Sequence, residues 1–545
     1  MKHVLLGLAL VLGEVGGLQP RDIYPKNPNI DALNYEFRIT LSDATDEIVG
    51  QATVDIRFRA SGITRVRLDL INERSDGRGM SVSEVTSSDG SVAFTHENDE
   101  LFIALSTPTQ VNQRSQYTVR YRGIPVTGLI IGPNSHGDRT FFSNNWPDKA
   151  RNWLPTIDHP YDKATSELIV TAPDHYQVVS NGLKIEETSL PGDMLLTHWK
   201  QSVPTATWLY NLGVARFAVQ HVDDYLGKAI QTWVYYQDRD AGFYDFAVPT
   251  KQVLEFYSNR VGPYSYEKLA NIQSNSVGGG MEAASSIFYG DNSVTGERTI
   301  RWRNVVIHEI AHQWFGNAVT EYDWDDVWLS EGFATYFTLL FREHRYGRDD
   351  FVQGLRESRD RVRSFYEENP DYRIVHDNLD DMSRVTSSQT YQKGGWTLHM
   401  LRGIIGDDAF WSGIQVYYHR YQDGNASTDD FRRAMEEASG SDLSEFFYQW
   451  LYQGGALEYE GGWRYDSGSG TIEIELNQVQ DDGYSFKMPV QVGIYSADET
   501  EPRIEVLQVN EMSNRFTISV ERQPESVVLD PDTWVLMDAD FAWRN

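Results

Sequence analysis

The stretch VVIHEIAHQWFGNAVTEYDWDDVWLSEGFATYF, residues 305–337, contains side chains suited to one shared chemical task. Its first part has helical spacing, and His308 and His312 are four residues apart, so both imidazoles project from one face of the expected helix. Two imidazoles one turn apart can bind the same metal ion at about 2.0–2.1 Å. The pattern therefore predicts a metal site on this helix.

Two glutamates complete the predicted site. Glu309 is adjacent to the first histidine, where it cannot readily join the same tetrahedron but can reach a water molecule near the metal. Glu331 begins a second expected helix, with Ser330 as its cap, and is the candidate third ligand, which leaves the fourth position of a zinc ion open. A chance motif or hydrogen-bonded core histidines are the alternatives. However, burying two imidazoles and a carboxylate without a partner is costly, and a metal removes that cost.

The composition excludes several classes of protein. The 545 residues are too many for one hydrophobic core, so we expect about two to four domains. A net charge of −31 disfavours binding to nucleic acid phosphates and to anionic lipid headgroups. The chain has no cysteine, which rules out disulfides, thiolate zinc ligands and cysteine nucleophiles.

The N-terminal segment 1–21 predicts a secretory leader. A basic start precedes an apolar run over residues 4–12, and small residues follow. This run is too short to span a bilayer and is typical of a signal peptide, so we expect export to the periplasm or secretion. A disordered or strand-forming N-terminus on a cytoplasmic protein is the alternative. No other stretch approaches 18 consecutive apolar residues, and we expect no stable membrane insertion.

Hydrophobic periodicity divides the rest of the chain into three regions. Period-two alternation, as in YEFRITL from residue 35, runs through 22–217 and predicts an all-β domain. Helical spacing dominates 218–455, and alternating strands return in 456–545, where we expect a β-sandwich. The predicted fold class is therefore multidomain α+β. The longest helices are expected near 300–316, 329–347, 349–367, 391–404 and 428–452.

The chain also resembles a known family. HEIAH followed by Glu331 in WLSEGFA resembles the zinc metallopeptidases of the aminopeptidase N and leukotriene hydrolase family, the gluzincin aminopeptidases. VGGGMEAAS (277–285) is similar to that family's Gly-x-Met-Glu-Asn segment, and TYQKGGWTLHML (390–401) to its Tyr-Glu-Lys-Gly segment. The resemblance implies a saddle of N-terminal β-sheets, a thermolysin-like, mostly helical catalytic domain and a C-terminal β-sandwich. The long C-terminal helical domain that many members carry is not expected here.

The resemblance implies a function as well. One zinc ion per chain would be bound by His308, His312 and Glu331, in a hydrolase that removes N-terminal residues from peptides. Glu309 would be the general base that activates the attacking water, and Tyr391 would stabilise the oxyanion.

Substrate binding is expected from the segment that contains Gly279, Gly280, Met281 and Glu282. The glycines let an extended substrate approach the backbone, and Glu282 would bind the free α-amine. Asn144 aligns with a family position that helps to hold the amine, and it would be a neutral helper.

Three departures from the family pattern bear on specificity and not on the expected ligands or base. Ala283 stands where the family has Asn, and Trp146 stands where it often has an acidic residue or Gln. Thr338 replaces an acidic residue seven positions after the glutamate ligand, so any support from that carboxylate must come from elsewhere.

Two alternative functions stay open at this point. One is an endopeptidase or oligopeptidase with a loose requirement for a free amine, and the other is a catalytically retired, zinc-stabilised peptide-binding protein. The presence of both Glu309 and Tyr391 argues against retirement. The expected partners are peptides with a free N-terminus. The sequence indicates neither the preferred side chain, the peptide length limit, the oligomeric state nor an epoxide hydrolase activity.

Overall fold

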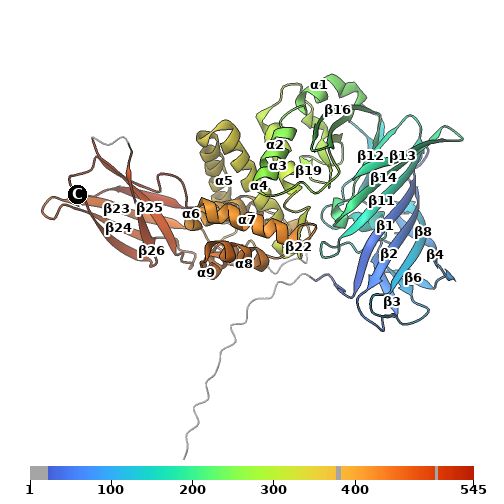
Figure 1. Ribbon diagram of the computed structural model, residues 1–545, viewed down its shortest axis with the longest axis horizontal. Helices are drawn as coiled ribbons and strands as arrows, with labels where there is room; N and C mark the ends of the chain where they lie inside the picture. The colour runs from blue at the N-terminus through green and yellow to red at the C-terminus, as the bar shows by residue number, and fades with distance from the viewer. Residues whose placement is uncertain (1–22, 376–381, 498–500, 545) are drawn as a thin grey trace, which may run out of the picture.

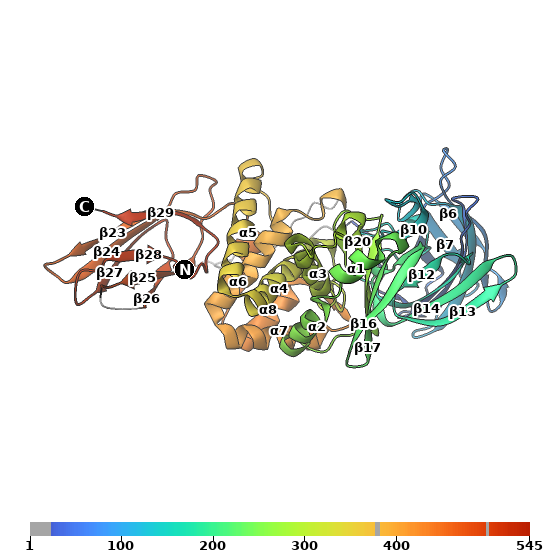
Figure 2. The same cartoon turned by 90° about the horizontal axis from the view of Figure 1, so that it is seen from above.

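Three structural regions follow one another along the molecule (Figure 1, Figure 2). The computed structural model describes residues 23–375, 382–497 and 501–544. Sheets from the N-terminal part of the chain lie at one end, helices lie in the middle, and C-terminal strands lie at the other end. The expected fold class, multidomain α+β with a β-rich start, a helical middle and a β-rich end, is confirmed. The expected leader lies outside the described residues.

The first region is built on an eight-stranded sheet. Its strand order is β13-β14-β11-β1-β2-β8-β4-β5, and only β1 and β11 pair in parallel. Strand β2 alternates buried and less buried residues along its length, as an antiparallel sheet with one packed face requires. The strands are β1 (Ile30–Thr40), β2 (Ile48–Phe58), β4 (Gly79–Ser87), β5 (Gly90–Ser91), β8 (Arg114–Ile124), β11 (Ala164–Pro173), β13 (Leu183–Leu190) and β14 (Met194–Thr205).

Two smaller sheets complete this region, in the orders β3-β7-β6 and β12-β15-β10-β9. Strands β10 and β12 lie on either side of β15 and are joined to it antiparallel. The strands are β3 (Arg65–Asp69), β6 (Phe94–Glu97), β7 (Glu100–Ala104), β9 (Leu129–Pro133), β10 (Arg139–Ser143), β12 (Gln177–Ser180) and β15 (Leu212–Ala215).

The middle region contains a five-stranded sheet that the helical spacing does not reveal. Its order is β16-β17-β18-β20-β19, which leaves the short strand β19 at an edge. Strand β18 is buried along its whole length, so it lacks the period-two alternation by which a strand is recognised in a sequence. The strands are β16 (Phe217–Tyr225), β17 (Lys228–Tyr235), β18 (Lys268–Ser274), β19 (Gly280–Met281) and β20 (Ser286–Gly290).

Helices form the rest of the middle region, together with the parallel strand pair β21 (Val319–Glu321) and β22 (Gly424–Ala426). None of the helices in the described part of the chain has the length and apolar character that crossing a membrane requires. The helices are α1 (Arg239–Asp245), α2 (Thr250–Arg260), α3 (Ile300–His312), α4 (Trp328–Tyr346), α5 (Arg348–Glu368), α6 (Gly394–Ile405), α7 (Asp407–Tyr421), α8 (Thr428–Ser439) and α9 (Ser444–Leu451).

Two of the expected helices differ from the structure in extent. The helix expected at 300–316 ends at His312, and Gly316 lies beyond it with φ of +105°. The segment expected as one helix at 428–452 contains both α8 and α9. Gly440 adopts a left-handed conformation with φ of +69°, which ends α8.

Two site residues also occupy positions that differ from the expectation. Ser330 does not cap α4, because that helix already begins at Trp328 and places Ser330 in its first turn. Tyr391 does not begin α6 but lies just before it, in a π-helical segment, Gln389–Lys393. Single π-helical turns of this kind occur frequently at functional sites.

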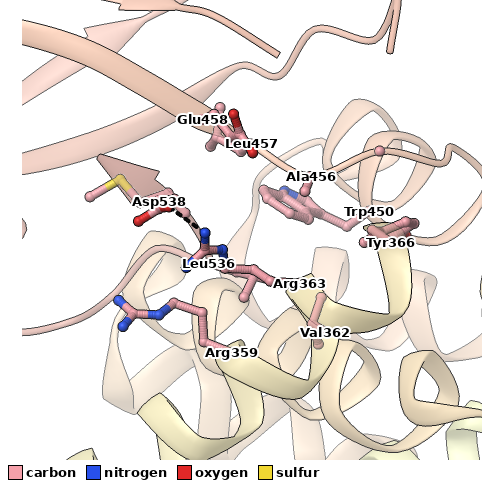
Figure 3. Close-up of a pocket in the computed structure, with 12 residues that line it drawn as sticks. Arg359, Val362, Arg363, Tyr366, Trp450, Ala456, Leu457, Glu458, Leu536 and Asp538 are labelled. Atoms are coloured by element: carbon pink, nitrogen blue, oxygen red, sulfur yellow. Dashed lines mark ion pairs between the residues drawn. The ribbon is translucent and has the colours of Figure 1, made fainter. Parts of the chain in front are cut away.

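The last region packs two sheets, in the orders β27-β24-β23-β29 and β26-β25-β28. Figure 3 shows where it meets α5: Arg363 pairs with Asp538 at 2.7 Å, beside Trp450 and Leu536. The hollow among these side chains is only about 10 Å³, so the junction is closely packed. The strands are β23 (Glu458–Asp466), β24 (Thr471–Gln478), β25 (Met488–Tyr495), β26 (Arg503–Val509), β27 (Ser513–Ser519), β28 (Ser526–Leu529) and β29 (Asp538–Trp543).

A close approach between backbones brings α4 against the π-helical segment and the start of α6. A Cβ atom on Gly332 would meet the carbonyl carbon of Gly394 at 2.9 Å and the carbonyl oxygen of Thr390 at 3.1 Å. Both neighbours are main-chain atoms, so only glycine fits at position 332. This contact fixes the segment that contains Tyr391 next to Glu331.

We expect Gly332→Ala to lower the free energy of unfolding by about 1–3 kcal/mol, because the added methyl group pushes two backbones apart. Gly395→Ala is the matched control. Its Cβ would meet the Thr335 side chain at 3.3 Å, and alanine favours the helix, so a change within about 1 kcal/mol is expected. Urea denaturation followed by circular dichroism measures both, and equal midpoints for the two variants would contradict the argument.

Candidate metal centre

Three ligand atoms from α3 and α4 form a nearly equilateral triangle. Nε2 of His308 and Nε2 of His312 are 3.1 Å apart. Oε2 of Glu331 lies 3.4 Å from the first nitrogen and 3.2 Å from the second. The structure thus brings together the three ligands predicted from the sequence, and all three side chains are largely buried.

This triangle has the dimensions of one face of a zinc tetrahedron. Bonds of about 2.0–2.1 Å at tetrahedral angles place neighbouring ligand atoms about 3.3–3.4 Å apart. Oε2 of Glu331 is buried and has no hydrogen-bond partner within the described residues, so the carboxylate oxygen at the triangle is available to a cation. The donor set of two imidazoles and one carboxylate is one that catalytic zinc sites use, and the residues present therefore fit zinc.

Hydrogen bonds on the far side of His312 orient its ring. Its Nδ1 lies 3.2 Å from the Phe315 carbonyl oxygen and 3.0 Å from the Ser330 hydroxyl. With Nδ1 donating to the carbonyl, Nε2 is left as the ligand atom. Gly316 makes room for this arrangement, since a Cβ there would lie 2.2 Å from the Ser330 hydroxyl oxygen. The role of Ser330 is thus to support a ligand.

The surroundings of His308 include the main chain of α4. The Ala334 carbonyl, in the second turn of α4, contributes to raising the pKa of the His308 ring, against the larger lowering effect of burial. The same carbonyl accepts a 2.7 Å hydrogen bond from the hydroxyl of Thr338, the residue that replaces the family's acidic side chain. Thr338 therefore bonds to the helix backbone near His308 and makes no contact of its own with that ring.

Glu309 is held against the glycine segment. A Cβ on Gly280 would lie 2.1 Å from Oε1 of Glu309, so the carboxylate occupies the space that a side chain would need. Burial, and then the nearby charge of Glu282, raise the pKa of Glu309 well above its ordinary value. Glu309 and Gly280 thus face each other beside the metal triangle.

The electrostatics of the pocket call for a cation. Burial raises the pKa of Glu282 to about 7. Burial alone would also raise the pKa of Glu331, but His312 and His308 beside it lower that pKa to about 2. Despite burial, Glu282 and Glu331 raise the pKa of His312 to about 10. The carboxylates thus stabilise positive charge at the triangle, and a divalent ion supplies it directly.

Tyr391 also reaches the metal ligands. Its hydroxyl donates a 2.7 Å hydrogen bond to Oε1 of Glu331, the oxygen that is not part of the triangle. Its ring lies parallel to that of His308, with centroids 6.1 Å apart. The structure therefore places this tyrosine at the metal ligands, where a substrate carbonyl can compete for its hydroxyl.

Glu282 is positioned by two amides that the sequence reasoning missed. The Glu282 carbonyl accepts hydrogen bonds from Gln313 at 2.9 Å and from Asn317 at 2.7 Å. Gln313 also accepts one from the Ser285 backbone, so it fastens the whole turn to the end of α3. Gln313 follows the HEIAH motif directly and Asn317 comes four residues later, and this closeness is the only sequence signal that could have found them.

The glycines and Met281 form the free edge of a sheet. Gly280 and Met281 make up β19, which pairs with β20 on one side only. The Gly279 carbonyl accepts a hydrogen bond from the Gly290 backbone at 2.9 Å. This edge leaves backbone groups available to an extended peptide.

Asn144 and Trp146, from the N-terminal region, contact the middle region. The side-chain amide of Asn144 donates one hydrogen bond to the Ser276 carbonyl at 3.0 Å. Trp146 packs edge-on against Trp324, with ring centroids 5.0 Å apart. Ala283 is buried behind Glu282. These contacts tie the regions together, and none is a hydrogen bond to the Glu282 carboxylate.

Glu321, at the end of β21, was also missed. It is 1% exposed, and neither carboxylate oxygen has a hydrogen-bond partner in the described part of the chain. Burial raises its pKa to about 8, and the charges of Glu282 and Glu331 contribute to that shift. At neutral pH its carboxyl group is therefore mostly protonated and uncharged.

Comparisons with known proteins agree with this site. The Peptidase family M1 domain matches residues 246–450, and the Peptidase M1 N-terminal domain matches residues 31–209. Together they cover well over half of the chain. The chain therefore belongs to peptidase family M1. This confirms the expected enzyme class, a zinc metallopeptidase.

Individual relatives are distant. The chain is 27% identical to Aminopeptidase A of Gloydius brevicauda over 78% of this chain and 47% of that protein. It is 28% identical to Probable aminopeptidase 2 of Sulfurisphaera tokodaii over 72% and 51%, and 30% identical to human Glutamyl aminopeptidase over 63% and 38%. The chain thus spans about half the length of these relatives, or less.

A solved structure shares the fold. The M1 zinc metallopeptidase of Deinococcus radiodurans superposes with a TM-score of 0.66 at 24% sequence identity. The match covers 78% of this chain and 94% of that one, so most of its fold has an equivalent here.

We expect the purified protein to contain about one zinc ion per chain and His308→Ala to lose it, because two ligands do not complete the triangle. His344→Ala is the control, since that histidine is exposed on α4 and stacks on Phe256. Metal analysis of the dialysed proteins measures both. Equal zinc content in the parent and His308→Ala would contradict the assignment.

Proposed function

We propose that this protein is a zinc-dependent aminopeptidase that hydrolyses N-terminal residues from peptides. The Glu282 carboxylate is the observation that carries the proposal. It is buried, its Oε1 has no hydrogen-bond partner in the described chain, and that oxygen lies 4.0 Å from the ring of His312. An ammonium group satisfies such a carboxylate, and a free N-terminus bound there brings the first peptide bond to the metal ligands.

Glu309 is the group in place to move protons. Zinc bound by His308, His312 and Glu331 would supply a Lewis acid and lower the pKa of a water molecule to about 7. Glu309 lies beside that position, with a carboxylate whose raised pKa suits proton exchange. It accepts the proton of the attacking water and then donates it to the departing amine nitrogen.

Tyr391 and the β19 edge prepare the substrate. The Tyr391 hydroxyl, now directed at Glu331, donates instead to the scissile carbonyl oxygen as negative charge develops there. An extended peptide adds to β19 through main-chain hydrogen bonds, which aligns its first carbonyl with the site. The Tyr391 hydroxyl and the free edge of β19 are both in position before a substrate binds.

A retired binding protein is disfavoured by the same residues. A site that only binds peptide gains nothing from Glu309 held against Gly280 or from a tyrosine hydroxyl 2.7 Å from a metal ligand. The proposal of turnover thus rests on residues that binding alone does not require.

We expect Glu309→Gln to lower kcat by about 10²–10⁴-fold on an aminoacyl amide, because the amide cannot accept the proton. Glutamine has nearly the same shape as glutamate and Glu309 is not a metal ligand, so the metal content is expected to match that of the parent. Glu297→Gln, an exposed substitution in the loop before α3, is the control and keeps full turnover. Parent-like kcat in Glu309→Gln would overturn the assigned base.

We expect substrates with a free amine to be cleaved and their N-acetylated forms to resist cleavage. Glu282→Gln is expected to raise KM for free-amine substrates by about tenfold or more, since a charge-assisted bond is lost. Glu321→Gln is expected to raise KM for the same substrates less. Steady-state kinetics on leucinamide test this, and efficient cleavage of acetylated peptides would favour the oligopeptidase alternative.

A further inference from the structure

A second pocket lies at the start of the helix that carries the histidines. It is about 190 Å³ in volume and is formed where α1, α2, the first turns of α3 and the end of α4 meet. Its residues belong neither to the metal triangle nor to the glycine segment. The lining residues are Asp245, Phe246, Val248, Pro249, Gln252, Ser293, Arg298, Thr299, Trp302, Arg303, Val306, Arg345 and Tyr346.

Three arginines line this pocket without a carboxylate partner. Arg298, Arg303 and Arg345 form no ion pair within the described residues, although the chain has an acidic excess of 31 charges. The contacts of Arg298 are the Tyr244 carbonyl and ring, and those of Arg303 are the Asn304 amide and the Tyr346 ring. Each guanidinium therefore keeps donors that no anion uses.

The one carboxylate in the lining does not neutralise them. Oδ2 of Asp245 accepts hydrogen bonds from the backbone amides of Thr295 and Gly296, and Oδ1 accepts one from that of Arg298. These bonds hold the loop before α3, and the Asp245 carboxylate faces the backbone amides of that loop. Asp245 thus offsets at most one of the three arginine charges, and the lining keeps a net positive charge.

Two further features of the wall suit an anion. The hydroxyl of Ser293, a residue that is 1% exposed, is buried without a hydrogen-bond partner in the described chain. Thr299 directly precedes α3 but makes no side-chain cap, and the first turn of this helix contains no acidic residue. The positive end of the helix dipole is thus open on the same side as the arginines.

The floor of the pocket is apolar. Phe246 and Val306 are 2% and 3% exposed, and Trp302 is 7% exposed. A purely hydrated anion such as phosphate would leave this surface unused, whereas a carboxylate attached to a short apolar group covers it.

We propose that this pocket binds a monocarboxylate with an apolar group of a few carbons, independently of the catalytic centre. The carboxylate pairs with Arg298 and Arg345, and the apolar group lies on Trp302. Two sources have this chemistry: the C-terminal residue of a peptide and a medium-chain fatty acid. N-acetylleucine and octanoate represent them, and neither has the free amine that Glu282 would bind.

Isothermal titration of the zinc-loaded protein tests the proposal. Binding of N-acetylleucine or octanoate is expected, and the stronger of the two identifies the source. N-acetylleucinamide, which lacks the charge, and inorganic phosphate, which lacks the apolar group, are each expected to bind at least about tenfold more weakly.

The double variant Arg298→Gln/Arg345→Gln is expected to weaken carboxylate binding by about tenfold or more. Arg356→Gln/Arg361→Gln changes the net charge equally on the exposed face of α5 and is expected to leave affinity unchanged. Urea midpoints within error of the parent verify the fold. Two results of the titrations would overturn the proposal: no binding of either carboxylate, or equally strong binding of the amide or of phosphate. Equal carboxylate affinity in the two double variants would overturn it as well, because the ligand would then be bound at the metal.

Discussion

The contact between α3 and α4 is the constraint on which the rest of the structure depends. Two imidazoles and one carboxylate converge to a triangle with sides of 3.1–3.4 Å, and each comes from a rigid helix. Such convergence of buried polar groups is unfavourable unless a cation is shared among them. Gly316 and Gly332 make it sterically possible, because each removes a side chain from the place where a ligand, its support or a neighbouring backbone must lie.

The surrounding elements serve this triangle in different ways. Gln313 and Asn317, just beyond α3, hold the turn that contains Glu282, and the π-helical segment carries Tyr391, whose hydroxyl bonds to Glu331. The strand β19 is at the edge of its sheet, and its free side is the proposed backbone partner of a peptide. The acidic groups that make the pocket costly to bury in an empty protein are the groups that a metal and an amine would neutralise.

Much of this was predictable because the decisive residues are close together in the sequence. His308, Glu309 and His312 lie within one turn or so of each other, and helical geometry alone places them on a common site. Period-two patterning likewise indicated the two β-rich regions. The central sheet was not predictable, because β18 is buried on both faces and its sequence does not alternate. Glu321 and Gln313 were missed since their roles depend on packing between distant segments.

X-ray absorption at the zinc edge of the purified protein tests the central claim most directly. The account predicts a four-coordinate ion with two imidazoles at about 2.0 Å and two oxygen ligands, one from Glu331 and one from solvent. Glu331→Gln replaces the charged oxygen ligand with a neutral amide and is expected to lower the zinc content, as His308→Ala does. A six-coordinate oxygen shell, or a spectrum with no imidazole contribution, would contradict the account.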